Sequence, residues 1–343
     1  MKKKALNILL LLALTSSSFS QTGGDNVYEF LNLTHSGLVS SLGGSNVSLS
    51  KIDLNLAYHN PALLNHGMQK SMALNYANYI AGINYGMAMY SPSFKKRGTF
   101  AAGLTYLNYG TFTESDASGN ITGDFGASEY AFLGTWSRNI DSLFSVGINV
   151  KPVLSHLESY TSFGIAFDFG AAYHNQSNLF SAGLVIKNVG LQITSYAGEP
   201  KQNLPFEIQA GLSQRLAHAP LRFSLTLRHL EKFDLTNEYS ASTDDDSESN
   251  SSDFFENVLR HIVMGAELIP HKNVYFSAGY NYQRRSELKV DAKGSAVGFS
   301  WGFGIKTSWL DLSFGRATYH LAGASNHVSI VVRHDKIYKK QNN

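Results

Sequence analysis

The sequence predicts an all-β protein, a transmembrane antiparallel β-barrel of about 14 strands with an N-terminal plug. Three observations support this: apolar residues recur on every second position, long and short connections alternate, and few residues are charged. Charged residues make up 16% of the 343 residues, compared with about 25% in an ordinary soluble domain. The chain has 30 glycines, 21 Phe and 18 Tyr but only seven prolines, which suits many strands with few breaks.

The first 20 residues (1–20) have the pattern of a secretory signal peptide. Residues 2–4 are lysines, residues 5–14 form an apolar run, and small residues lead to Ser20. A membrane anchor is the alternative, but this run is shorter than the roughly 20 residues with which a helix crosses a bilayer. The chain contains no cysteine, so we expect neither a disulfide framework nor an acylated cysteine. These features predict an exported protein.

Residues 163–173, FGIAFDFGAAY, show the alternation clearly. Phe163, Ile165, Phe167 and Phe169 take every second position, and small residues with one aspartate stand between them. This is the period of a β-strand. A strand of a soluble sandwich would carry Lys, Glu and Thr on its second face. We therefore interpret the apolar face as facing lipid, with the core of a soluble sandwich as the alternative.

The same alternation recurs along the chain and predicts fourteen strands. They begin near Gln69, Ala81, Gly98, Ala127, Leu143, Thr161, Asn178, Pro205, Pro220, Asn257, Asn273, Ser295, Trp309 and Asn326. Most are long enough to supply the 9 to 11 tilted residues that cross a bilayer. Only a closed barrel leaves no sheet edge unpaired in lipid. We therefore assign 69–337 to the barrel and 338–343 to a C-terminal tail.

The connections carry a second regularity. Those after even-numbered strands are mostly short, as in NIDS, HNQS and LAHA, whereas GTFTESDASGNITGDFG and SYAGEPKQN follow odd-numbered strands. Two connections depart from the rule, since SPSFKKR is not minimal and the turn after the first strand is very short. Outer-membrane barrels have short periplasmic turns and long external loops. The pattern predicts a multi-pass protein of the cell outer membrane, with membrane lipid as a partner. The net charge of +2 gives no reason to expect binding to nucleic acid.

The inward face is predicted to carry charges of both signs. The alternation assigns to it Glu129, Asp168, Glu207, Glu267, Lys151, Lys187, Arg222 and Arg228. A pore selective for one sign of ion would be lined by one sign of charge, so we expect a lumen filled by another part of the chain. Residues 21–68 precede the first strand and are the candidate plug. A disordered periplasmic arm is the alternative, although the segment is rich in Leu and Val for a solvated tail.

Motifs of catalysis or cofactor binding are missing from the sequence. It contains no HExxH, no GxSxG and no phosphate-binding loop, and its twelve histidines lack the spacing of metal ligands. A dense acidic cluster is compatible with calcium or a basic partner, but a solvated loop explains such a run more simply. The cluster comprises Asp244, Asp245, Asp246, Glu248 and Asp253. We expect no enzyme activity, no cofactor and no metal site.

Two segments resemble the PorV/PorQ family, whose members are relatives of the FadL long-chain fatty-acid transporters. One is GGDNVYEFLNLTHSGLVSSLGG followed by NLAYHNPALL, in which Asn60, Pro61 and Ala62 match a turn of the FadL-type N-terminal hatch. The other is residues 204–235, LPFEIQAGLSQRLAHAPLRFSLTLRHLEKFDL. The resemblance covers essentially the whole mature chain and includes the fourteen-strand count.

The resemblance implies an outer-membrane component of the type IX secretion system of Bacteroidota. In particular it implies a docking barrel of the cell-surface attachment complex, which holds PorZ beside PorU and PorV. Two alternatives stay open. One is a FadL-like transporter of hydrophobic ligands, which would need a hydrophobic pocket and a lateral opening, and the other is a PorV-like shuttle for secreted substrates. Contact with lipopolysaccharide is also left open.

Overall fold

A computed structural model describes residues 26–94, 98–235, 250–288, 296–320 and 323–341. The predicted signal peptide, 1–20, lies outside the described residues, and so do the acidic residues 244–248. The side chain of Asp253 is not described either.

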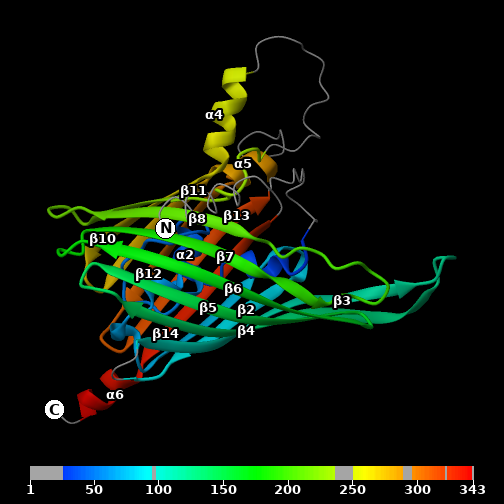
Figure 1. Cartoon of the computed structure of the whole chain (residues 1–343), viewed down its shortest axis with the longest axis horizontal. Helices are drawn as coiled ribbons and strands as arrows, with labels where there is room; N and C mark the ends of the chain where they lie inside the picture. The colour runs from blue at the N-terminus through cyan, green and yellow to red at the C-terminus, as the bar shows by residue number, and fades with distance from the viewer. Residues whose placement is uncertain (1–25, 95–97, 236–249, 289–295, 321–322, 342–343) are drawn as a thin grey trace, which may run out of the picture.

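Fourteen antiparallel strands close into a barrel in which β1 pairs with β14 and every other strand pairs with its neighbours in sequence. The strands are β1 Ser71–Asn78, β2 Asn84–Ser91, β3 Thr99–Ser115, β4 Ile121–Asn139, β5 Phe144–Leu157, β6 Tyr160–His174, β7 Phe180–Thr194, β8 Glu207–Arg215, β9 Leu221–Leu227, β10 Ile262–His271, β11 Val274–Asn281, β12 Phe299–Lys306, β13 Leu310–His320 and β14 Gly323–Arg333. This confirms the predicted fold class, and Figure 1 shows the closed wall.

The described helices are short and are separate from the strands of the wall. Within the plug are η1 Glu29–Asn32, α2 Gly37–Ser41, α3 Leu56–His59, η2 Pro61–Leu63 and η3 His66–Met68, and elsewhere are η4 Ile80–Gly82, α4 Asn250–Arg260, α5 Tyr282–Leu288 and α6 His334–Gln341. Among the described residues, no helix is both long and apolar enough to cross a bilayer. The helix α6 begins directly after β14, so the predicted tail at 338–343 starts inside it.

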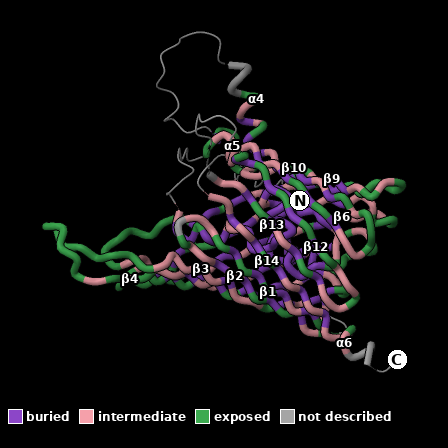
Figure 2. Tube along the Cα trace, turned by 180° about the vertical axis from the view of Figure 1, so that it is seen from behind, coloured by how far each residue is buried: buried purple, intermediate pink, exposed green. Residues whose placement is uncertain are grey.

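Side chains of each strand alternate between the lumen and the outer surface. In β6, Ala166 and Asp168 are fully buried, whereas Phe163 and Phe169 are exposed by 37% and 45%. Figure 2 shows the same alternation of buried and exposed residues around the wall. The large apolar side chains therefore form the outer surface, which is the surface that faces lipid in an outer-membrane barrel.

The segment from Asn26 to Met68 occupies the lumen, where it appears in blue in Figure 1. It begins beside the β7–β8 connection, where the Val27 N–H donates to the Asn203 carbonyl over 2.9 Å. It ends at Met68, next to the start of β1. Since those two points lie at opposite ends of the strands, the plug crosses the lumen from one mouth to the other.

The two mouths differ in their connections. At the mouth where β1 begins and β14 ends, the strands are joined by residues 92–98, 140–143, 175–179, 216–220, 272–273 and 307–309. The opposite mouth carries the longer connections, including residues 195–206 and those that contain α4 and α5. Because outer-membrane barrels keep short turns in the periplasm, we assign the first mouth to the periplasm and the second to the cell surface.

Two predicted boundaries differ most from the structure. Residues 110–126 were expected to form an external loop, but β3 and β4 continue through most of them as a paired hairpin. The tenth strand was expected near Asn257 and begins at Ile262, because residues 250–260 form the helix α4. Both errors lie outside the barrel wall, where lipid does not impose the alternation.

We expect Phe223→Arg to destabilise the barrel. Phe223 is 48% exposed on the outer face in the middle of the seven-residue strand β9, and a cation on the lipid face costs about 2–4 kcal/mol near the bilayer midplane. The measurement is urea unfolding of the barrel in liposomes.

The matched control is Phe254→Arg. Phe254 is similarly exposed, at 53%, but lies in α4 outside the wall, so this change should leave the unfolding free energy nearly unaltered. Equal stability of Phe223→Arg and the wild type would contradict the lipid-facing assignment.

Candidate functional site

The turn at Asn60, Pro61 and Ala62 lies deep in the lumen. The Asn60 side chain caps η2 by accepting from the Ala62 N–H over 3.0 Å. Its Nδ2 donates to the Val47 carbonyl over 2.8 Å and to the Ala171 carbonyl of β6 over 3.2 Å. One side chain thereby holds the turn together, joins it to the preceding part of the plug and attaches both to the wall.

Glycines in the wall make room for this turn. A Cβ on Gly147 of β5 would lie 2.4 Å from the Pro61 carbonyl carbon, and one on Gly170 of β6 would lie 2.1 Å from the Asn60 Oδ1. Gly147 and Gly170 are direct cross-strand partners. The plug backbone therefore packs against the wall at a distance that only glycine permits.

A buried ion pair forms the centre of the polar lumen. Lys151 Nζ of β5 lies 2.7 Å from Asp168 Oδ1 of β6, and both side chains are fully buried. Asp168 also accepts from Asn149 Nδ2 over 3.0 Å and from the Asn188 N–H over 2.9 Å. Lys151 donates to Asn188 Oδ1 over 2.5 Å. The charges are thus neutralised and their hydrogen-bonding positions largely filled, which buried ions require.

This network continues into the plug. Asn188 Nδ2 donates to Asn32 Oδ1 over 2.9 Å, and Asn149 Nδ2 donates to the Ala57 carbonyl over 3.3 Å. Asn188 is able to reach inward because β7 has a register shift there and the residue takes a positive φ of 57°. The bulge turns both Lys187 and Asn188 toward the lumen, where each is buried.

Two further ion-pair groups lie in the lumen. Glu267 of β10 binds Lys51 of the plug over 2.7 Å and Arg222 of β9 over 3.0 Å. Glu207 of β8 receives two hydrogen bonds from Arg228, over 2.8 and 3.2 Å. The mixed charge predicted for the inward face is confirmed, and most of these charges are paired across strands or with the plug.

Apolar side chains fill the space between the polar groups. One cluster joins Leu31 of the plug to Tyr85 and Leu107 of the wall, and a second joins Leu54 and Met68 to wall residues. Leu38, Val39, Leu42, Leu49 and Leu56 form a third cluster with Ala62, Leu63, Ala172 and Tyr275. The plug is therefore packed like a protein core.

His35 of the plug is buried and neutral. Its ring lies 4.8 Å from that of Tyr58 and 5.3 Å from that of Tyr85, both edge to face. Its Nδ1 has no hydrogen-bond partner among the described residues. Burial, with the nearby charges of His327 and Lys187, lowers the pKa of His35 to about 3. Burial also lowers the pKa of His59 well below its usual value.

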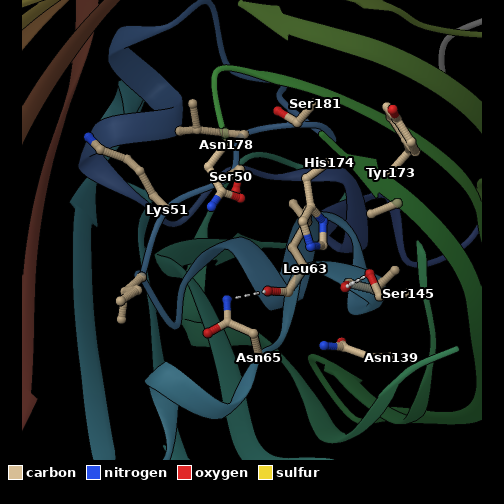
Figure 3. A pocket seen from close by; sticks show the side chains of 14 residues that line it. Ser50, Lys51, Leu63, Asn65, Asn139, Ser145, Tyr173, His174, Asn178 and Ser181 are labelled. Atoms are coloured by element: carbon tan, nitrogen blue, oxygen red, sulfur yellow. Dashed lines mark hydrogen bonds between the residues drawn. The ribbon is translucent and has the colours of Figure 1, made fainter. Parts of the chain in front are cut away.

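A cavity of about 320 Å³ with a mixed polar and apolar lining opens at the periplasmic mouth (Figure 3). Plug residues Lys51 and Asn65 line one side, and His174, Asn178 and Ser181 of the β6–β7 region line another. In the figure, Asn65 Nδ2 donates to the Leu63 carbonyl over 3.1 Å. Leu49, Ile52 and Leu63 of the plug supply an apolar part of the lining.

A larger cavity of about 900 Å³ lies at the cell-surface mouth. The pairing of β7 with β8 stops at Lys187 and Glu207, whereas β7 stays paired with β6 as far as Thr194. The cavity lies beside this part of β7. It is lined by Asn26, Glu29, Asn32, Asn188, Val189, Gly190, Lys201, Gln202, Asn203, Leu204, Pro205, Phe206, His229, Glu231, Lys232 and Leu235. Its lining mixes charged, polar and apolar groups.

The alternation alone did not reveal the residues that join plug to wall. Asn149 has the parity of Lys151 and falls on the predicted inward face, but Asn188 follows the inward Lys187 and falls on the predicted outer face. Asn32 and Lys51 have no feature in the sequence that sets them apart from other polar residues of the plug. One signal in the sequence could have suggested these contacts. The plug contains amides and a cation, and the predicted inward face of the wall carries charges with which they could pair. No group of three or more His, Asp or Glu side chains within the described ranges is arranged to hold a metal ion.

Solved structures with the same fold are outer-membrane barrels. The Ralstonia pickettii toluene transporter TbuX is 13% identical, with a TM-score of 0.52 over 88% of this chain and 98% of that one. The Pseudomonas putida toluene transporter TodX is 11% identical, with a TM-score of 0.51 over 87% and 96%. At these identities the likeness shows the fold, a FadL-like 14-strand barrel. No protein-family model matches the sequence, and no curated protein matches it.

Lys151→Met should destabilise the barrel strongly. The substitution leaves the fully buried Asp168 without its cation, and removal of one partner of a buried ion pair costs about 3–5 kcal/mol. Urea unfolding in detergent measures the change.

The double variant Lys151→Met, Asp168→Leu is the matched comparison. It removes both charges, so it should be more stable than the single variant even though it loses more hydrogen bonds. A single variant as stable as the wild type would contradict the pairing.

Wild-type stability should fall on acidification below about pH 6.5, the usual pKa of histidine. The folded state keeps His35 neutral down to about pH 3, whereas the unfolded chain binds the proton, so the unfolding free energy declines by up to about 1.4 kcal/mol per pH unit for each such histidine. Thermal unfolding at pH 7.5, 6.0 and 4.5 measures this slope.

His35→Phe keeps the ring contacts and removes the titration, so its slope should be shallower than that of the wild type. His156→Phe, at an exposed position of β5, is the control and should keep the wild-type slope. Identical slopes for all three proteins would refute the role of His35.

Proposed function

We propose that this chain is a docking barrel of the outer membrane, whose work is done at its cell-surface end while its lumen stays filled. The filled lumen is the observation that carries the proposal. The plug reaches both mouths, and it is joined to the wall through Asn60, Lys51 and Asn32. A barrel occupied in this way serves as a membrane-anchored platform more readily than as an open pore.

The partner follows from the family resemblance. Residues 204–235, which resemble the PorV/PorQ family, form β8, β9 and the start of the next external connection. The proposal is that the barrel belongs to the attachment complex of the type IX secretion system and holds PorZ beside PorU and PorV. The described connections at the cell-surface mouth supply surfaces for such partners.

Transport of a hydrophobic ligand is the second candidate. The likeness in fold to TbuX and TodX supports it, and taken alone that comparison favours transport over docking. A local observation adds to this, because the end of β7 lacks a β8 partner beside the 900 Å³ cavity, and Leu191 and Ile193 are exposed there by 56% and 40%. A lateral route for a ligand would pass through this part of the wall.

Deletion of the gene in its host separates the candidates. The docking function predicts that secreted surface proteins are released into the medium, while growth on long-chain fatty acids is unchanged. Loss of that growth with normal surface attachment would favour transport. Direct binding of the C-terminal signal domain of a secreted protein to the purified barrel would favour the PorV-like shuttle.

The filled lumen predicts little or no conductance in planar bilayers. The wild-type barrel should remain near the baseline current, because the plug packs against the wall at both mouths. The double variant Lys51→Ala, Asn60→Ala should open more often, since it loses one plug-to-wall ion pair and the hydrogen bonds of Asn60 to the wall and within the plug. A large and steady wild-type current would contradict the proposal.

A further inference from the structure

The β3–β4 hairpin extends well beyond the barrel wall. β2 pairs with β3 as far as Asn108, and β5 pairs with β4 only from Ala127 onward. We call residues 110–126 the arm, and within it residues 111–115 pair with residues 121–126 across the hairpin. Figure 1 shows the arm projecting away from the wall. Six residues at roughly 3.4 Å each give it a reach of about 20 Å beyond the rim.

The arm leaves the wall at a built bend. The register shifts between Asn108 and Gly110, and Gly110 takes a φ of 88°. Tyr109 is the extra residue, and its hydroxyl donates to Glu129 Oε2 over 2.7 Å. A bulge of this kind re-aims the strand while its extra residue anchors in the mouth. The direction of the arm is therefore fixed by the barrel.

The tip of the arm is ordered by one side chain. Asp116 Oδ1 accepts from the N–H groups of Ser118 and Asn120, each over 2.9 Å, and Oδ2 accepts from Asn120 Nδ2 over 2.9 Å. The Gly119 N–H donates to the Asp116 carbonyl. These bonds close the turn without help from any other segment, so the arm is preorganised for contact.

Both edges of the arm are open within the part of the chain that the structure describes. The last wall bond on the β4 side is from the Glu158 N–H to the Gly126 carbonyl. Proteins usually guard open edges with charged side chains, above all lysine, or with proline. Residues 110–126 contain no Lys, Arg or Pro, and their charges are all acidic. A two-stranded ribbon of this kind is only marginally stable alone in water. An added strand from another protein would complete it.

An aromatic pair marks one face of the arm. Phe112 and Phe125 are cross-strand partners, and their rings are stacked with centroids 5.3 Å apart. Phe112 is 43% exposed. Glu129 and Ala131 of β4 face the lumen, and Phe125 shares their parity along that strand. The pair thus continues the lumen side of the sheet and is not part of the lipid-facing side.

The negative charge of the arm indicates which kind of partner could bind to it. Its only charged residues are Glu114, Asp116 and Asp124. Like charges would oppose pairing with the arm of a second copy, and anionic head groups of a membrane would repel it. A partner with basic side chains would be attracted and steered to it.

We propose that the arm is a docking element for a soluble cell-surface protein that presents an unpaired edge strand with basic side chains. Strand addition along an open edge supplies the backbone hydrogen bonds, and Phe112 with Phe125 supplies the apolar anchor. The inference deepens the proposed docking function and rests on it.

The first experiment uses purified PorZ as the probe and the full-length barrel in detergent micelles. In one variant Asn-Gly replaces residues 111–126 between the paired Gly110 and Ala127, and a second variant carries Phe112→Ala and Phe125→Ala. Each should lose at least about 30-fold in affinity, the effect of a binding hot spot. The control is Tyr160→Ala, an exposed aromatic of β6 outside the arm, and it should bind within about twofold of the wild type. Heat-dependent gel mobility verifies that every variant is folded.

The outcomes separate the two proposals. If the shortened barrel binds PorZ as well as the wild type does, the arm inference is overturned and the docking function stands. If the wild type itself does not bind PorZ, the docking function is overturned. A second measurement then tests whether the arm is covered by another protein in intact cells.

The second measurement needs no identified partner. The chain has no cysteine, so a single Thr113→Cys reports on the arm and a single Glu199→Cys in the β7–β8 connection serves as the control. A membrane-impermeant maleimide should label Cys at position 113 at least fivefold more slowly in intact cells than in the purified barrel, with little change at position 199. Equal rates at position 113 would overturn the inference. Disulfide-linked dimers of Thr113→Cys would replace the proposed partner with a second copy of the chain.

Discussion

The structure depends on one constraint: within lipid, no water is available to pair with the backbone, so every strand must find a neighbour on both sides. Closure of β1 on β14 satisfies that requirement. It also gives every strand an outer face that must be apolar and an inner face that lipid does not touch. The inner face is free to carry glycine, amides and charge, and those residue types then determine what fills the lumen.

Unpaired charges in a lumen of this kind would be costly in free energy. Residues of the plug therefore pair with charged and polar residues of the wall. Lys51 of the plug supplies a second cation to Glu267, and Asn32 of the plug accepts a hydrogen bond from the wall residue Asn188. Wall glycines let the Asn60 turn approach closely enough for its side chain to bond the β6 backbone. Buried ion pairs contribute little net stability compared with apolar packing, but they penalise wrong registers heavily. We infer that they fix where the plug sits.

Much of the wall was predictable from the sequence, because lipid imposes the alternation directly. The strand count, the outward set that includes Phe163 and Phe169, and the mixed charge of the inward face all follow from it. Prediction was wrong where that constraint ends. The residues of the arm were interpreted as a loop, since most of them are Gly, Thr, Ser or Asp. Cross-strand pairing, including that of Phe112 with Phe125, nevertheless extends the sheet past the rim. Cross-strand partners and the bulge at Asn188 depend on register, which a period-2 pattern does not specify.

The division between wall and rim also bears on how function is distributed in the molecule. Lipid requires of the wall only an apolar outer face and a fully paired backbone. Barrels of 11–13% identity therefore share the wall although their sequences differ. At the cell-surface rim, water forms hydrogen bonds with the backbone, so a strand there does not need a neighbouring strand on both sides. Both departures from closure described above, the end of β7 and the arm, lie at that rim. Within the described residues, the periplasmic mouth has short connections and the cavity of about 320 Å³. A platform and a transporter therefore differ at the outer rim and in the lumen contacts of the plug. Substitutions at these positions are expected to act on one function without unfolding the wall.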